Sequence, residues 1–246
     1  MPQHFVAPPQ WEWYIVWYFF LGGLAGGAYA LGAILRLFGD RRDADASRLA
    51  FLVALPALAI CPILLTLDLG RPLRFWHMLI DPRTMTLNFK YWSPMSDGVW
   101  SLLIFSAFAF LSFLEAVLGE ERFLLFRGAF GRLLLVLGTI SGLFLAGYTG
   151  VLLSVSNQPI WSDTWTLGGL FLASGLSVAA AALGLLTRLS AGEESTEGKL
   201  SRADLCFVVL ELALLIAFFV SLGAMGTRLL GPRWLLLWAH LLGGTP

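Results

Sequence analysis

Charged residues are scarce in this sequence of 246 residues, and only 13% are Asp, Glu, Lys or Arg. A soluble domain usually has about 25% charged residues, so this content is roughly half of the usual value. Hydrophobic residues make up 58% of the chain, and the mean hydropathy is +0.78. These values exclude a soluble globular domain and an intrinsically disordered chain. The 16 basic residues are matched by 16 acidic ones, which leaves no net basic surface for a nucleic acid.

Potential metal ligands are also few. The two cysteines, Cys61 and Cys206, are too few for a disulfide framework or an iron–sulfur cluster. The three histidines, His4, His77 and His240, fall outside the long hydrophobic stretches, whereas a b-type cytochrome holds its haem with pairs of His inside them. The glycine-rich run near the N-terminus has no Lys and follows no strand, unlike a phosphate-binding loop. We therefore expect no haem, iron–sulfur cluster or metal in this chain.

Six hydrophobic stretches are long enough to cross a bilayer, which needs about 20 apolar residues per helix. They cover residues 13–38, 49–67, 98–118, 133–155, 164–186 and 205–225. A seventh stretch, 234–242, is too short to span. The first ten residues contain no Lys or Arg, so we expect no secretory signal peptide and a retained first helix. The sequence predicts an all-α integral membrane protein forming one transmembrane domain over residues 1–246.

Basic residues and tryptophans divide between the two ends of these helices. The connections after the first, third and fifth stretches hold ten Lys and Arg, and the other side holds six, which places the N-terminus outside. All ten tryptophans fall on the predicted outer side: Trp11, Trp13, Trp17, Trp76, Trp92, Trp100, Trp161, Trp165, Trp234 and Trp238. Interface anchoring, a docking surface and a ring-binding site all remain open as reasons for this one-sided distribution.

A few polar side chains lie at membrane depth, where ionisable groups are costly. Glu211 is predicted about 10 Å from the inner side, as a proton relay or as a bond to a neighbouring helix. Glu115, near the inner end of its stretch, is expected to reach water. Tyr18 and Tyr148 lie in the outer halves of their helices, and a buried Tyr hydroxyl needs a partner. Paired glycines at 22–27 predict close helix packing or room for a flat ligand.

Five segments, in this order and spacing, resemble the NrfD/PsrC family. They are YFFLGGLAGG (18–27), DLGRPLRFWH (68–77), SPMSDGVW (93–100), GYTG (147–150) and NQPIW (157–161). This family comprises haem-free, quinone-interacting membrane subunits of complex iron–sulfur molybdoenzymes such as polysulfide reductase. The resemblance extends from about residue 11 to residue 230.

The resemblance implies a subunit of the bacterial inner (cytoplasmic) membrane that binds menaquinone or ubiquinone near the outer, periplasmic face. It also implies two partners, a ferredoxin-like four-cluster iron–sulfur subunit and a molybdopterin catalytic subunit. These carry the electrons and the substrate chemistry, so the direction of electron flow and the substrate stay open.

The resemblance also implies roles for individual residues. Tyr148 matches the family Tyr that bonds a quinone carbonyl, whereas Tyr18 stands near a position where polysulfide reductase has a His. Asp68 and Arg71 match a loop motif at the mouth of the site, and Asp68 or His77 would pass protons outward. Trp17 is expected beside the quinone, and Glu211 is expected in an inner proton pathway. Because the residue at position 18 differs from that of polysulfide reductase, the resemblance defines the fold more closely than the contacts to the quinone ring.

Two other classes of function remain open at this point. A small transporter or proton or ion carrier would use polar midplane groups and broken helices, and Pro56 and Pro62 lie within the second stretch. A purely structural membrane anchor would keep the docking surface without needing Tyr148.

Overall fold

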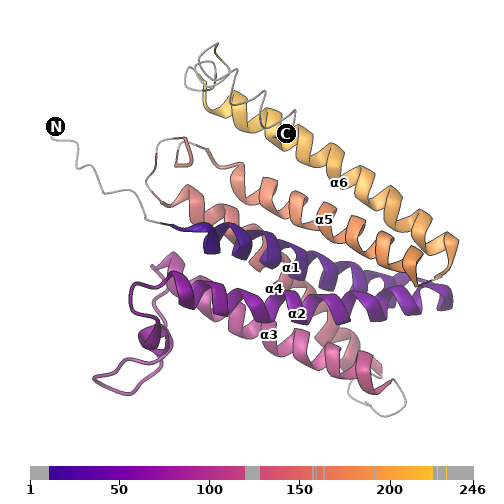
Figure 1. Cartoon of the computed structure of the whole chain (residues 1–246), viewed down its shortest axis with the longest axis horizontal. Helices are drawn as coiled ribbons and strands as arrows, with labels where there is room; N and C mark the ends of the chain where they lie inside the picture. The colour runs from indigo at the N-terminus through magenta and orange to yellow at the C-terminus, as the bar shows by residue number, and fades with distance from the viewer. Residues whose placement is uncertain are drawn as a thin grey trace.

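The computed structural model describes residues 11–119, 128–156, 158, 160–162, 164–190, 192–223, 226 and 231, and this part of the protein is almost entirely helical. Its helices are α1 (Trp13–Phe38), α2 (Ala44–Asp68), α3 (Pro94–Leu118), α4 (Gly128–Ser154), α5 (Leu167–Leu189) and α6 (Glu194–Ser221). Two short 3₁₀ helices, η1 (Arg41–Asp43) and η2 (Pro72–Met78), precede and follow α2. Figure 1 shows the six long helices running side by side as an elongated bundle.

The prediction of six membrane-spanning helices is confirmed within the described residues, where six helices have the required length and hydropathy. α1 has the predicted bounds, but α2 and α6 begin earlier than residues 49 and 205. Their first turns contain Asp45, Glu194 and Glu197, so these helices extend past the hydrophobic runs that the prediction followed. The stretch 234–242 and the predicted end of the sixth span at 225 lie outside the described residues.

α1 is the central helix and packs against α2, α4 and α5. Its glycines allow the close approach that the sequence predicted. A Cβ atom on Gly26 would overlap the backbone carbonyl of Gly142 in α4, and one on Gly27 would lie 2.6 Å from the Gly175 oxygen in α5. These contacts fix α1 between α4 and α5 with backbone nearly against backbone.

α6 lies at the edge of the bundle and packs mainly on α5 (Figure 1). Its start is fixed to η1, because the Lys199 ammonium lies 2.7 Å from the carboxylate of Asp43 and Thr196 donates to the same carboxylate at 2.7 Å. Most of its apolar side chains point outward, and Ile216 is 66% exposed. In a bilayer this outer face meets lipid or a partner protein.

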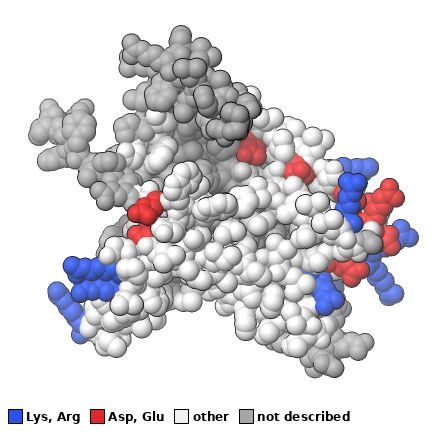
Figure 2. Space-filling view, viewed as in Figure 1, with Lys and Arg blue, Asp and Glu red and all other residues white. Residues whose placement is uncertain are grey.

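The two ends of the bundle differ in chemistry. We call the end where α1, α3 and α5 begin the aromatic end. It holds all eight described tryptophans, as expected: Trp11, Trp13, Trp17, Trp76, Trp92, Trp100, Trp161 and Trp165. Figure 2 shows Lys and Arg gathered at the two ends and a mostly uncharged surface between them. This surface fits a bilayer core.

The expectation that Glu115 reaches water is wrong. Glu115 is only 2% exposed, and its carboxylate pairs with the Arg36 guanidinium at the end of α1 opposite the aromatic end. Nearby, Arg48 donates from Nε to the Ala116 carbonyl at 2.6 Å. Arginines from the preceding helices thus enclose the end of α3, which keeps this carboxylate from water.

Candidate functional site

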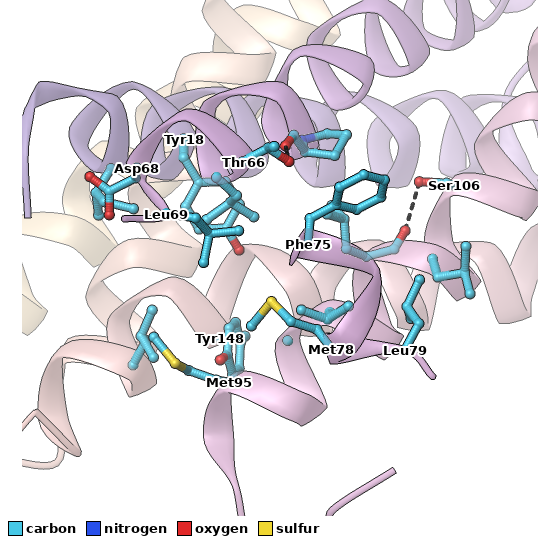
Figure 3. A pocket seen from close by; sticks show the side chains of 18 of the residues that line it. Tyr18, Thr66, Asp68, Leu69, Phe75, Met78, Leu79, Met95, Ser106 and Tyr148 are labelled. Carbon is cyan, nitrogen blue, oxygen red and sulfur yellow. Dashed lines mark hydrogen bonds between the residues drawn. The ribbon is translucent and has the colours of Figure 1, made fainter. Parts of the chain in front are cut away.

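A cavity of about 280 Å³ opens at the aromatic end, between α1, α2, α3 and α4. Figure 3 shows side chains of these helices and of η2 converging on it. The lining comprises Trp11, Ile15, Tyr18, Pro62, Leu65, Thr66, Asp68, Leu69, Phe75, Met78, Leu79, Met95, Gly98, Val99, Leu102, Leu103, Ser106, Tyr148 and Leu152. Most of these side chains are apolar. A few polar groups in an apolar cavity are typical of small-molecule sites, whose volumes start near roughly 300 Å³.

Tyr148 on α4 is held in place by two residues of α3. Its hydroxyl donates a hydrogen bond to the backbone carbonyl of Pro94. Its ring fills the space beside Gly98, where an added Cβ would lie 2.6 Å from Tyr148 Cζ. Pro94 and Gly98 both belong to the 93–100 motif, so this motif positions the side chain of Tyr148.

Tyr18 on α1 lies across the cavity from Tyr148 and is 2% exposed. In Figure 3 its hydroxyl points toward the space that Leu69, Met78 and Tyr148 surround. This hydroxyl makes no hydrogen bond with any described residue. A hydroxyl that faces an apolar cavity and that none of the described residues engages is suited to bind a ligand oxygen.

Asp68 stands at the mouth of the cavity as the last residue of α2. One carboxylate oxygen accepts the backbone N–H of Glu12 at 3.2 Å, which connects the start of α1 to the end of α2. The other polar lining groups, Thr66 and Ser106, each donate to a carbonyl of their own helix at 2.7 Å. Asp68 is therefore the charged group among the lining residues.

The segment between α2 and α3 is folded against this mouth. η2 contributes Phe75 and Met78, and an antiparallel bridge joins Ile80 to Leu87. Trp100 of α3 donates from Nε1 to the Asn88 carbonyl at 3.3 Å. The loop is thus ordered against the helices and closes one side of the cavity.

The structure brings three of the predicted site residues together in the cavity: Tyr18, Asp68 and Tyr148. Arg71 directly precedes η2 and His77 lies near its end. Neither lines the cavity, although Phe75 and Met78 of η2 do.

Trp17 and Glu211, two further predicted site residues, do not line the cavity. Trp17 is 57% exposed on the outer surface of α1, and its ring packs edge-on against Phe20. Glu211 lies on α6 beyond α5. Asp204, two turns earlier on α6, accepts a hydrogen bond of 2.7 Å from Ser177 of α5. Asp204 was not among the residues predicted from the sequence, although its spacing of seven residues from Glu211 puts both on one helix face.

The cavity fits a flat, mainly apolar ring that carries oxygen acceptors. The apolar walls exclude water, and Tyr18 can donate to an oxygen without losing a hydrogen bond to any described residue. Tyr148 can do the same only if its hydroxyl turns away from Pro94. Within the described residues no group of three His, Cys, Asp or Glu side chains is placed to hold a metal ion.

The fold and the cavity define a multi-pass membrane protein with an apolar site at one end of its helix bundle. The chain belongs to the NrfD family, because residues 2–230 match the family described as Polysulphide reductase, NrfD. The chain is therefore a membrane subunit of an oxidoreductase complex. Its family and its six membrane-spanning helices are consistent with a location in the bacterial inner membrane.

Three curated relatives agree with this membership. The protein is 28% identical over 235 residues to Protein NrfD of Escherichia coli (strain K12), covering 86% of the present sequence and 71% of that protein. It is 29% identical over 231 residues to a polysulfide reductase polypeptide of Wolinella succinogenes, covering 86% of the present sequence and 70% of the relative. It is also 28% identical over 102 residues to a selenate reductase subunit of Mesobacillus selenatarsenatis, covering 42% of the present sequence and 24% of that subunit.

Proposed function

We propose that this chain is the quinone-binding membrane subunit of a reductase-type complex and that the cavity lined by Tyr18, Asp68 and Tyr148 is the quinone site. The observation that carries the proposal is the joint placement of these residues, from three different helices, in one apolar cavity. A quinone ring is flat and apolar and has a carbonyl oxygen at each end. The hydroxyl of Tyr18, which none of the described residues engages, matches such an acceptor.

A bound quinone supplies two-electron, two-proton chemistry. In this proposal Tyr18 donates a hydrogen bond to one ring oxygen, and Tyr148 orients the ring from the opposite wall. The carboxylate of Asp68 at the mouth exchanges the protons with the aqueous phase. His77 in η2 and Tyr18 extend this route, and Arg71 contributes positive charge to the mouth.

The electrons leave or enter through a partner protein at the aromatic end. The loop 69–93 presents large exposed apolar side chains there, such as Leu73 at 90% and Tyr91 at 76%. Exposed apolar surface of this extent is typical of an interaction site. We propose that an iron–sulfur subunit docks on this loop, on the periplasmic side, and connects the quinone site to a molybdopterin catalytic subunit.

Glu211 is proposed as part of a second, inner proton route. Glu211 follows Asp204 by seven residues on α6, so the two lie on one helix face, and Asp204 accepts a hydrogen bond from Ser177 of α5. This role is separate from the quinone site, because neither residue lines the cavity.

Substitution of each tyrosine tests the quinone site. Tyr18→Phe removes the donor that is proposed to bind the ring oxygen, and a lost hydrogen bond of about 1 kcal/mol predicts a several-fold higher apparent KM for quinol in the assembled complex. Tyr148→Phe removes the bond to Pro94 and is expected to lower quinol-linked turnover. Unchanged quinol kinetics in both variants would show that the assigned site is wrong.

Quinone extraction distinguishes the proposal from the two alternatives. The purified complex is expected to contain quinone and to show no haem bands in a redox-difference spectrum. A complex without quinone that still holds its partner subunits would indicate a purely structural anchor. Solute or ion flux through the reconstituted protein alone would indicate a carrier.

A further inference from the structure

A second, larger cavity of about 480 Å³ lies on the other side of α1, against α5. We call it the α1–α5 groove. Its lining is mostly apolar and includes Val16, Phe19, Phe20, Phe171 and Ser174. Neither the quinone proposal nor any predicted site residue uses this groove.

The packing of α1 and α5 creates the groove. The two helices meet at Gly23 and Gly175, where an added Cβ on Gly23 would lie 3.2 Å from Gly175 Cα. Toward the aromatic end, the rings of Phe19 and Phe171 lie between the helices with their centroids 5.6 Å apart. The stacked rings of Trp11 and Trp161, 6.2 Å apart and nearly parallel, close the end of the groove.

The edge of the groove faces the bilayer core. Val16 and Phe20 border it on a membrane-spanning helix and are 56% and 46% exposed. Water would find few polar partners inside, because the lining is apolar apart from Glu12 and Ser174. A hydrocarbon tail from the adjoining leaflet fits this lining and this opening.

The polar end of such a lipid would lie beside the tryptophans that mark the membrane–water interface. Among the residues that line the groove, the charged group is the carboxylate of Glu12, which is exposed next to the Trp11–Trp161 stack. A carboxylate attracts an ammonium group and repels a headgroup with net negative charge.

We infer that the α1–α5 groove binds one acyl tail of a phospholipid whose headgroup carries an amine, with the amine beside Glu12. This lipid fills the space between α1 and α5 that their side chains leave open. It is separate from the quinone site, although Trp11 and Ile15 line both cavities.

Photo-crosslinking of the wild-type protein tests the site directly. The protein is reconstituted with phosphatidylethanolamine that carries a diazirine on its acyl tail, and the labelled residues are mapped after illumination. We expect labelling at residues 15–23 and 171–178 to exceed, severalfold, that on the exposed face of α6 at Leu212 and Ile216. Equal labelling of both regions overturns the inference.

Two further arms distinguish the occupants. The same probe on a phosphatidylglycerol headgroup is expected to label the groove several-fold less, and equal labelling overturns the role of the amine. Excess polyprenyl quinone is expected to leave the labelling unchanged, and displacement would show that a quinone tail occupies the groove. Because the quinone site is measured separately by its turnover, failure here leaves the proposed function intact.

Bound lipid can also be counted. Ser174→Phe fills the groove and is expected to lower the phospholipid retained after detergent purification by one molecule per protein. Ala181→Phe adds a similar ring to an exposed position of α5 and serves as the control. Equal retention in Ser174→Phe and wild type overturns the inference.

Discussion

Tyr148 is positioned by two residues that have no polar or reactive side chain. Pro94 supplies a carbonyl for its hydroxyl, and Gly98 leaves the space for its ring. Tyr18 differs because its hydroxyl has no hydrogen-bond partner in the described part of the protein. The two tyrosines are thus unequal, with Tyr148 already bonded and Tyr18 ready to bind a ligand.

Gly98→Ala tests the positioning of Tyr148 at the scale of one residue. The added methyl would lie 2.6 Å from Tyr148 Cζ, so the ring must move and its bond to Pro94 must lengthen or break. We expect quinol-linked turnover to fall severalfold while the complex still assembles. Gly70→Ala is the control, because a Cβ there meets nothing within 4 Å. Equal turnover in the two variants would contradict the importance of the Tyr148 position.

At the scale of a helix, α1 is the element around which the bundle packs. It contacts α2, α4 and α5, and its buried glycines set the distance to the last two. The sequence predicted the bounds of α1 and gave close packing as one of two roles for these glycines, because small residues four apart lie on one face of a helix. It could not show which helices they meet, since that depends on contacts between distant segments.

Gly27→Ala tests the packing of α1. Its Cβ would lie 2.6 Å from the Gly175 oxygen and 2.8 Å from Ala179 Cβ, so α1 and α5 must separate. Overpacking of this kind typically costs about 1–3 kcal/mol, and we expect a lower Tm in detergent. Gly22→Ala, whose nearest neighbours lie 3.9 Å away, should leave the Tm close to wild type. A Tm for Gly27→Ala equal to that of Gly22→Ala would contradict the close packing of α1 on α5.

For the whole molecule, the two ends have separate tasks. The aromatic end holds both cavities, the folded loop and the described tryptophans. The opposite end fixes its helices through Arg36 with Glu115 and Lys199 with Asp43. The sequence predicted the class and the aromatic end from composition and Trp position. It misplaced Glu115, because depth along a helix does not show whether a neighbouring arginine covers the side chain.

Lys and Arg are in excess at the end of the bundle opposite the aromatic end, and this predicts that the aromatic end is periplasmic. In a background without Cys61 and Cys206, Gly70→Cys at the aromatic end is expected to react with a membrane-impermeant maleimide in intact spheroplasts. Asp45→Cys, exposed at the opposite end, is expected to react only after the membrane is permeabilised. The reverse pattern would place the quinone site on the cytoplasmic side.

The quinone content of a cavity-filled variant tests the central claim most directly. Ser106 lines the first cavity, whereas Ser101, about a turn and a half earlier on α3, does not, and each donates to a carbonyl of its own helix. We expect the purified complex with Ser106→Phe to lose most of its extractable quinone, while Ser101→Phe retains the wild-type amount. Wild-type quinone content in the Ser106→Phe complex would contradict the assignment of this cavity as the quinone site.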